Sequence, residues 1–231
     1  MTARLSIIMP TLNEAATIES VLSSALSSLR ALGLANELVV VDGASTDDTA
    51  TLAATLADRV VQVPQDQRGR ARQMNAGAAV ANGDYLLFLH ADTELSNQAA
   101  EELKSAMDKR VIWGRFDVRI TGQSFMLGMV ACLMNWRSRV TGIATGDQAM
   151  FVRRDVFEYI GGFADQPLME DIELSKSVRK LAHPTCLKGP VITSGRRWDE
   201  RGALKTIILM WQLRWRYWRG ASAEQLAKAY R

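Results

Sequence analysis

The hydrophobic and polar positions of the first 90 residues alternate between a period typical of strands and a period typical of helices. Short apolar runs predict buried strands, and stretches with an apolar residue at every third or fourth position predict helices. The strands are expected at 5–9, 37–41, 60–63 and 84–89, and the helices at 18–32, 47–58 and 67–81. Strands that alternate with helices predict βαβ units, and therefore an α/β fold with a mostly parallel sheet flanked by helices on both faces.

The second half of the chain is less regular but continues the same mixture of elements. Strands are expected at 113–120, 148–153 and 186–193, and helices at 125–139, 155–160, 170–181 and 204–217. We find no internal repeat, low-complexity tract or linker in the sequence. The chain is therefore expected to form a single domain.

Polar segments follow three of the predicted strands, at the point where each strand ends. Their sequences are PTLNE at 10–14, DGAS at 42–45 and HAD at 90–92. Ligands of open parallel sheets bind beyond the carboxyl ends of the strands, so neighbouring strands are expected to deliver Asp42 and Asp92 into one crevice. Two acids there suit a divalent cation that bridges to a substrate diphosphate. The alternative is that each acid caps a helix or closes a turn.

Two further acids, Glu170 and Asp171, begin the predicted helix 170–181. The helix dipole favours negative charge at this position, and a carboxylate kept ionised there can act as a general base on a substrate hydroxyl. The alternative is that both acids only complement the helix dipole. The chain has neither a GxGxxG fingerprint after a strand nor a GxxxxGK[ST] loop, which disfavours a dinucleotide-dependent dehydrogenase and a P-loop kinase.

The order of the motifs is more specific than any one of them. SIIMPTLNE, VVDGASTDDT, RGRARQMNAGAAVANGDYLLFLHADT, TGDQAMFVRRDVFEYIGGF and EDIEL follow one another along the chain. This succession, over roughly residues 4–200, resembles the family-2 glycosyltransferases of the GT-A fold. The short length and the HADT spelling are most similar to the small bacterial group of that family associated with radical-SAM and selenodomain proteins.

The resemblance implies a division of the domain. Residues 1–94 would form the nucleotide-sugar-binding half, 95–200 the acceptor and catalytic half, and 201–231 a C-terminal helical tail. The donor would be contacted by residues after the first strands and around the later motifs. They are Pro10, Thr11, Asn13, Glu14, Asp42, Arg70, Asn75, Ala91, Asp147 and Arg197.

The resemblance also implies the chemistry. Asp171, with Glu170 beside it, matches the catalytic base, and Asp92 matches the acid that meets a divalent cation, Mg²⁺ or Mn²⁺. His90 stands where the family's Asp-x-Asp motif usually has its first acid. Imidazole can ligate Mn²⁺ but suits Mg²⁺ poorly, so His90 is either a metal ligand or a hydrogen-bonding group for ribose or phosphate.

The expected function is transfer of a sugar from a nucleotide diphosphate donor, a UDP-sugar, to a hydroxyl acceptor with inversion at the anomeric carbon. Two alternatives stay open at this point. One is a non-catalytic nucleotide-sugar-binding protein, and the other is a nucleotidyltransferase of similar fold. Nucleotidyltransferases usually have a glycine-rich loop after the first strand, and PTLNE has none.

Charge divides the chain into two parts of opposite sign. The formal net charge of the 231 residues is only +3, yet residues 196–231 contain nine Lys or Arg and three Asp or Glu, so the first 195 residues are net negative. A nucleic-acid partner is therefore not expected. In the basic tail, Trp211, Trp215 and Trp218 alternate with Arg214, Arg216 and Arg219. This predicts either contact with a membrane surface or packing of Ile207, Ile208, Trp211 and Trp215 onto the domain or a second copy.

Composition excludes several other classes. With 48% hydrophobic and 23% charged residues, the chain can bury a core that needs no disulfide or structural metal. Cys132 and Cys186 have no CxxC spacing, which argues against a zinc site and fits a reducing compartment. The sequence also lacks the pattern of a signal peptide and an apolar run of about 20 residues. We expect a cytoplasmic protein, or a peripheral one at the inner face of the membrane.

Overall fold

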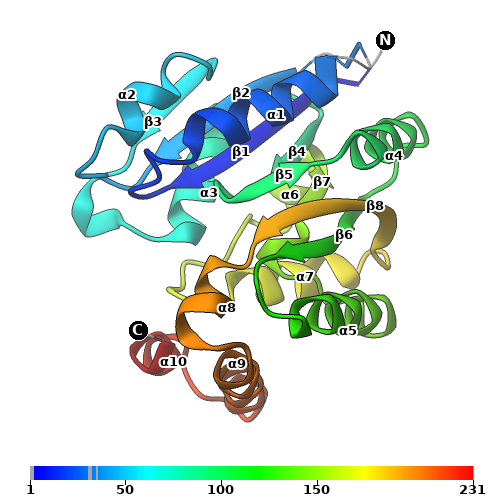
Figure 1. Ribbon diagram of the computed structural model, residues 1–231. Coiled ribbons are helices and arrows are strands. Elements are labelled where there is room, and N and C mark those ends of the chain that lie inside the picture. Colours follow the sequence, from blue (N-terminus) through cyan, green and yellow to red (C-terminus); the bar gives the residue numbers. More distant parts are fainter. Residues whose placement is uncertain (1–2, 31–32, 35, 231) are drawn as a thin grey trace.

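The computed structural model describes residues 3–30, 33–34 and 36–230, and its strands form one curled sheet covered by helices on both faces (Figure 1). Within the described residues the sheet has eight strands in the order β3-β2-β1-β4-β7-β6-β8-β5. Their bounds are β1 Leu5–Thr11, β2 Asn36–Asp42, β3 Arg59–Gln62, β4 Tyr85–Phe88, β5 Thr93–Leu95, β6 Trp113–Thr121, β7 Met150–Arg153 and β8 Thr185–Ser194.

Strand direction determines which loops meet. β3, β2, β1 and β4 are all parallel, which confirms the expected parallel sheet in the first half of the chain. β7 runs antiparallel to both β4 and β6, β8 runs parallel to β6, and β5 is antiparallel to β8. The carboxyl ends of β1, β2, β4, β6 and β8 therefore lie along the same edge as the start of β7.

The helices follow the strands in the order that the hydrophobic pattern predicts, with additions. Their bounds are α1 Ile18–Arg30, α2 Thr49–Ala53, α3 Arg70–Val80, α4 Asn97–Asp108, α5 Met126–Thr141, α6 Arg154–Tyr159, α7 Glu170–Arg179, α8 Arg196–Arg201, α9 Ala203–Trp218 and α10 Ala223–Tyr230. Side chains alternate along the strands between two cores. Ile7 faces the core built with α1, α4 and α5, whereas Ile8 faces the core built with α3, α6 and α7.

Several predicted bounds were wrong. The helix expected at 47–58 is only Thr49–Ala53, because the Asp58 carboxylate accepts a hydrogen bond from the Leu38 backbone at 2.7 Å and draws the chain into β3. The helix expected at 67–81 begins at Arg70, after a short 3-10 turn. Strand β5 and helix α4 were not predicted, although the Ser96 hydroxyl caps α4 by accepting a hydrogen bond from Ala99 N at 3.1 Å.

The C-terminal tail folds back onto the domain through a small core of its own. Leu213 of α9 and Leu226 of α10 pack with Met169 and Ile172 near the start of α7. The Tyr217 hydroxyl adds a hydrogen bond to Glu173 Oε1 at 2.5 Å. The side of α9 that carries Leu213 and Tyr217 therefore contacts the body at α7.

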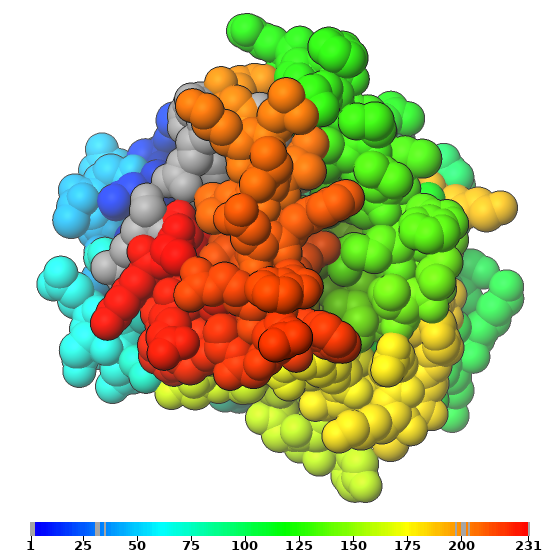
Figure 2. Space-filling model, turned by 90° about the horizontal axis from the view of Figure 1, so that it is seen from below, coloured from blue at the N-terminus to red at the C-terminus, as the bar shows by residue number. Residues whose placement is uncertain are grey.

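Of the four residues predicted to pack, Ile207 packs against the core that contains α1, α4 and α5. The prediction that Ile208, Trp211 and Trp215 pack onto the domain was wrong, since these side chains are 54%, 68% and 60% exposed in the single chain. Leu213 lies on the opposite side of the helix and takes the buried position instead. Packing onto a second copy stays a prediction. Seen from below, α8 to α10 and α5 lie next to one another on one face of the molecule (Figure 2). Among the described residues, none of the helices combines the length and the apolar character of a bilayer-spanning segment.

Candidate active site

The candidate site lies along the edge where β1, β2 and β4 end. Thr11 pairs with Asp42 at the ends of β1 and β2, and β4 lies on the other side of β1. The expectation that Asp42 and Asp92 follow neighbouring strands was therefore wrong, because β1 lies between β2 and β4. Asp42 is buried, and its two carboxylate oxygens accept hydrogen bonds from the Ser45 amide at 2.9 Å and the Ser45 hydroxyl at 2.5 Å.

The segment after β1 interlocks with the segment after β2. Pro10 and Thr11 are the last two residues of β1, and Asn13 adopts the left-handed conformation with φ 55°. The Asn13 amide donates to Ser45 Oγ at 2.9 Å, and its side-chain oxygen accepts from Thr46 N, also at 2.9 Å. Glu14 N donates to Thr49 Oγ1 at 2.8 Å. The two predicted donor segments thus form one hydrogen-bonded unit.

Two residues that sequence reasoning missed donate hydrogen bonds to backbone carbonyl oxygens of this unit. Gln73 is buried on α3, and its Nε2 donates to the carbonyl oxygens of Thr11 and Val41, each at 2.8 Å. Arg68 donates to the carbonyl oxygens of Gly43 and Ala44, also at 2.8 Å. Both residues lie in the motif RGRARQMNAG, so their proximity to Arg70 and Asn75 was the available signal.

The end of β4 meets the start of β7. Because Phe88 pairs with Met150, His90 lies beside the 3-10 turn Gly146–Gln148, and its Nδ1 is 3.6 Å from Asp147 Oδ1. The His90 ring packs so closely on Gly146 that a Cβ there would lie 2.5 Å from His90 Cε1. The structure therefore brings together His90 and Asp147, two predicted site residues from motifs far apart in the sequence.

The acids at the start of α7 complete this cluster. Asp171 Oδ2 accepts a hydrogen bond from Gly146 N at 2.9 Å, and Glu170 Oε1 lies 3.7 Å from Arg70 Nη1. Burial and the neighbouring Asp171 carboxylate raise the pKa of Glu170, and the positive charge of Arg70 opposes this. Burial would lower the pKa of Arg70, but the surrounding carboxylates raise it overall. Asp171 and Arg70 thus join one electrostatic cluster with His90 and Asp147.

Asp92 lies two residues after His90, in the turn between β4 and β5. Its Oδ1 accepts from Thr93 Oγ1 at 3.2 Å, while Ala91 beside it is buried. Burial raises the pKa of Glu14, the charge of Arg196 lowers it and the charge of Asp92 raises it. The charges of Asp92 and Arg196 therefore act on Glu14, although the three residues lie after β1, after β4 and at the start of α8.

Two of the residues predicted to contact the donor, Asn75 and Arg197, are not part of the clusters described above. The Asn75 side chain donates to Phe163 O at 2.8 Å and accepts from Phe163 N at 2.9 Å, so its amide joins α3 to the turn before α7. The side chain of Arg197 lies outside the described part of the structure. Its predicted contact with the donor phosphates stays a prediction.

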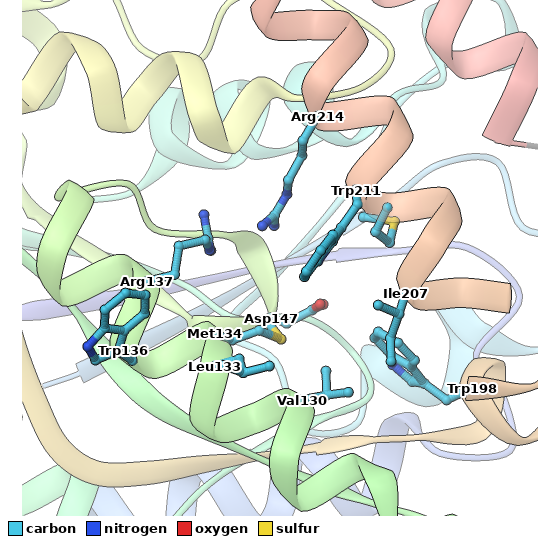
Figure 3. Close-up of a pocket in the computed structure, with 11 residues that line it drawn as sticks. Val130, Leu133, Met134, Trp136, Arg137, Asp147, Trp198, Ile207, Trp211 and Arg214 are labelled. Atoms are coloured by element: carbon cyan, nitrogen blue, oxygen red, sulfur yellow. The ribbon is translucent and has the colours of Figure 1, made fainter. Parts of the chain in front are cut away.

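A cavity of about 260 Å³ opens next to the acid cluster, between α5 and α9 (Figure 3). Asp147 reaches into it together with two arginines, Arg137 of α5 and Arg214 of α9. The remaining lining residues are apolar or aromatic: Val130, Leu133, Met134, Trp136, Trp198, Ile207, Met210 and Trp211. Sequence reasoning missed Arg137, although a charged residue within the apolar run 125–139 was a usable signal.

Comparison with known families decides the class of protein. A family model described as "Glycosyl transferase family 2" matches residues 6–161. The chain belongs to this family. The motifs from SIIMPTLNE to VFEYIG lie within the matched residues, so the resemblance to family-2 glycosyltransferases is confirmed. The association with radical-SAM and selenodomain proteins stays a prediction.

Solved structures show the same fold. This glycosyltransferase aligns over 83% of its length with residues 1–349 of Staphylococcus aureus TarS in complex with UDP-GlcNAc, with a TM-score of 0.66, 18% identity and 58% of that chain covered. The mannosyltransferase PcManGT from Pyrobaculum calidifontis, in complex with GDP-Man and Mn²⁺, gives a TM-score of 0.58 at 25% identity, covering 84% of this chain and 57% of that one. The expected α/β fold of GT-A type is confirmed.

Curated relatives are longer than this glycosyltransferase. Glucosyl-3-phosphoglycerate synthase of Mycobacterium tuberculosis is 38% identical over 94 residues, which are 38% of this chain and 28% of the relative. Glycosyltransferase AglD of Haloferax volcanii is 28% identical over 180 residues, which are 73% of this chain and 28% of the relative. The chain thus spans about a third or less of these relatives.

The described residues fit a divalent cation only in part. Among them, no group of three or more His, Cys, Asp or Glu side chains is placed to hold a metal ion. His90 Nδ1 faces Asp147, and Asp92 is the acid at the end of β4. Mg²⁺ and similar hard cations need only one or two carboxylates when phosphate and water oxygens complete their shell. The donor set therefore fits a cation held jointly by Asp92 and a bound diphosphate.

Proposed function

We propose that this family-2 glycosyltransferase transfers a sugar from a UDP-linked donor to an acceptor hydroxyl, with inversion at the anomeric carbon and Asp171 as the general base. The observation that carries the proposal is the position of Asp171. Its carboxylate is oriented by Gly146 N at 2.9 Å, next to the turn that contacts His90 at the end of β4. This is the edge of the sheet at which ligands of α/β folds bind.

In this proposal the donor lies along the edge formed by β1, β2 and β4. The nucleotide contacts the segment from Pro10 to Glu14 and Asp42, and the diphosphate lies toward Arg70 and Ala91. The complex of PcManGT with GDP-Man and Mn²⁺ supports a nucleotide-sugar donor and a cation, because that protein is 25% identical over most of this chain. Asn75, Asp147 and Arg197 are proposed to complete the donor site.

Asp171 is suited to accept the proton. It is the second residue of α7, where the helix dipole stabilises the ionised carboxylate. Each of its oxygens accepts one backbone hydrogen bond, from Gly146 and Ile172, and keeps a second lone pair for the acceptor hydroxyl. As Asp171 takes the proton, the acceptor oxygen bonds to the anomeric carbon from the face opposite the nucleotide, and the bond from that carbon to the β-phosphate oxygen breaks. This order of events inverts the anomeric configuration.

Glu170 acts as a positioning residue in this mechanism. Its buried carboxyl lies against Arg70 and beside Asp171, and its raised pKa limits the negative charge next to the base. When bound at Asp92 with His90 nearby, Mg²⁺ or Mn²⁺ supplies positive charge that neutralises the departing diphosphate.

The first experiment measures donor binding. Thermal unfolding is recorded with UDP-, GDP- and dTDP-sugars, each with and without Mn²⁺, because a ligand that binds only the folded state raises its stability. We expect the largest rise in Tm with a UDP-sugar and Mn²⁺. No rise with any nucleotide sugar would refute the donor assignment.

The second experiment measures the reaction products and the base. Release of a nucleoside diphosphate is expected, whereas release of pyrophosphate would indicate a nucleotidyltransferase. Asp171→Asn should keep the donor-induced rise in Tm and reduce turnover at least a hundredfold, since general-base catalysis contributes about 10²–10⁴-fold. Asp108→Asn, on the surface of α4, is the matched control and should change neither quantity. Turnover of Asp171→Asn near that of the wild type would rule out the base assignment.

A further inference from the structure

The cavity between α5 and α9 holds two arginines with buried nitrogen atoms that have no hydrogen-bond partner among the described residues. Arg137 and Arg214 point toward one another across it, and Asp147 also lines it (Figure 3). Arg137 Nε, Arg137 Nη2 and Arg214 Nε are buried, and none of the three has a hydrogen-bond partner among the described residues. Buried guanidinium donors are costly when they are unpaired, so this arrangement needs an explanation.

The charges of the two side chains make the arrangement more unfavourable in the free protein. Burial and the positive charge of Arg214 lower the pKa of Arg137 to about 10, against the opposing effect of Asp171. Burial also lowers the pKa of Arg214, against the carboxylates of Asp171 and Asp147. Two neighbouring guanidinium groups that each have an unpaired N–H donor suit an anion with several oxygens, because such an anion can accept hydrogen bonds from both groups.

The rest of the cavity is apolar. Leu133 and Met134 of α5 face Ile207 and Trp211 of α9, and Trp198 of α8 closes one end. A small, fully hydrated anion would leave these walls unused. The combination of an anion site with apolar walls therefore matches a ligand that has both an anionic group and a hydrocarbon part.

The cavity continues into an exposed apolar surface. Both helices carry large apolar side chains at helical spacing that are at least 49% exposed. On α5 and the residue before it they are Phe125, Met129, Leu133, Trp136 and Val140, and on α9 they are Leu204, Ile208, Trp211, Trp215 and Trp218. We call these the two apolar stripes. The two helices that carry them lie next to one another on the same face of the molecule (Figure 2), and Leu133, Trp136 and Trp211 of the stripes line the cavity.

The charge around the stripes favours a lipid surface over a second copy of the chain. Lys205, Arg216 and Arg219 are exposed on α9, and the Arg219 guanidinium lies over the Trp215 ring at 5.5 Å from its centroid. Tryptophan next to arginine suits the boundary between water and an anionic lipid layer. In a symmetric dimer the same cationic helix would face itself, and like charges would repel.

We propose that the groove formed by Arg137, Arg214 and the apolar walls binds a lipid acceptor that carries a phosphate. The phosphate lies between the two guanidinium groups, and the hydrocarbon chain follows the groove toward the apolar stripes, where a membrane presents it. This rests on the proposed function, because the acceptor hydroxyl must reach Asp171. Asp147 lines the cavity, and the residue before it, Gly146, donates its backbone N–H to Asp171 Oδ2 at 2.9 Å, so the base lies next to the groove.

The test measures binding of simple probes by calorimetry, below their critical micelle concentrations and in a phosphate-free buffer. Decyl phosphate carries both parts of the ligand, decanol lacks the phosphate, and inorganic phosphate lacks the chain. We expect decyl phosphate to bind at least tenfold more tightly than either of the other two. Equal affinity for decyl phosphate and decanol, or for decyl phosphate and inorganic phosphate, would overturn the lipid phosphate assignment.

Variants locate the probe. Arg137→Gln and Arg214→Gln should each raise the Kd of decyl phosphate about tenfold, and the double variant should abolish detectable binding. Arg216→Gln, on the exposed side of α9, is the matched control and should change the Kd less than twofold. Circular dichroism checks that each variant is folded. Unchanged affinity in the folded double variant would overturn the proposal.

One further measurement separates this inference from the proposed function. Nucleotide-sugar binding is recorded by thermal shift on the same samples: if a UDP-sugar binds and decyl phosphate does not, only the acceptor inference fails. If decyl phosphate binds through the two arginines and no nucleotide sugar binds, the proposed function fails and the groove assignment stands.

Vesicles of phosphatidylcholine with and without phosphatidic acid test whether a membrane presents the lipid, and we expect flotation of the protein only with phosphatidic acid. Absence from both kinds of vesicle, or a dimer formed through α9, would overturn membrane presentation.

Discussion

If Arg137 is retained for a ligand, its replacement should make the free protein more stable. Arg137→Met removes a buried guanidinium whose Nε and Nη2 have no partner among the described residues, and it also removes the repulsion from Arg214. Methionine keeps most of the apolar stem that packs in the groove. Replacement of an arginine whose guanidinium is fully paired within the fold would instead make the protein less stable.

The size of the effect follows from the pKa. The shift of Arg137 from 12.5 to about 10 corresponds to about 3 kcal/mol, at about 1.4 kcal/mol per unit. Because the pKa is lowered, the cost applies to the charged form, is fully present at pH 7 and disappears only as the pH rises through about 10 toward 12.5. Lost packing offsets about 1 kcal/mol of the gain. We expect the free energy of unfolding to rise by about 2 kcal/mol, or Tm by roughly 4–8 °C.

The assay is urea unfolding in a phosphate-free buffer, analysed by linear extrapolation. The matched control is Arg139→Met on the same helix. Arg139 Nη2 lies 2.7 Å from Asp117 Oδ2, so its loss should lower the free energy of unfolding by about 0.5–1 kcal/mol. Decyl phosphate should stabilise Arg137→Met less than it stabilises the wild type. A fall in stability for Arg137→Met as large as that for Arg139→Met would refute the reasoning.

Three other predictions test the site and the core. Gly146→Ala should displace His90, since the new Cβ would lie 2.5 Å from its Cε1, and kcat should fall at least tenfold while the protein stays folded. Asp92→Ala should weaken nucleotide binding with Mn²⁺ and leave binding without Mn²⁺ unchanged, which calorimetry measures. Hydrogen bonds from Ser6 and Asn82 outweigh burial and lower the pKa of Glu37 below 4.5, so stability should fall as the pH drops through that range, and Glu37→Gln should flatten the pH profile of unfolding.

The first of these predictions has a matched control, and the other two each have an outcome that would contradict them. Gly128→Ala, on α5 with open space around its Cβ, should leave kcat unchanged. Equal loss of binding in Asp92→Ala with and without Mn²⁺ would indicate a role for Asp92 that does not involve a cation. If the pH dependence of unfolding in Glu37→Gln equals that of the wild type, another carboxyl causes the loss of stability at low pH.

Local patterns in the sequence were sufficient to predict most of the strands and helices and the acids of the candidate site. Apolar runs and helical spacing encode burial within a few residues, so strands such as β1 and helices such as α1 could be predicted. The motifs placed Asp92 and Asp171 at a strand end and a helix start, where structure finds them. Helix α4 was missed even though Ala99, Leu103 and Met107 follow helical spacing, because its alanine-rich pattern is weakly hydrophobic.

Tertiary structure alone decided which of these elements meet. The order of strands places β1 between β2 and β4, and this depends on crossover connections that no local pattern contains. The buried side of α9 was mispredicted, since Leu213 rather than Trp211 contacts the body, and apolar spacing on a helix with two apolar sides does not select one. Arg137 and Arg214 lie far apart in the sequence and share one cavity only because α5 and α9 pack side by side. The sequence by itself determined the family and the acids at the strand and helix ends, because these follow from local chemistry. The pair of buried arginines in the cavity is a property of the packed chain.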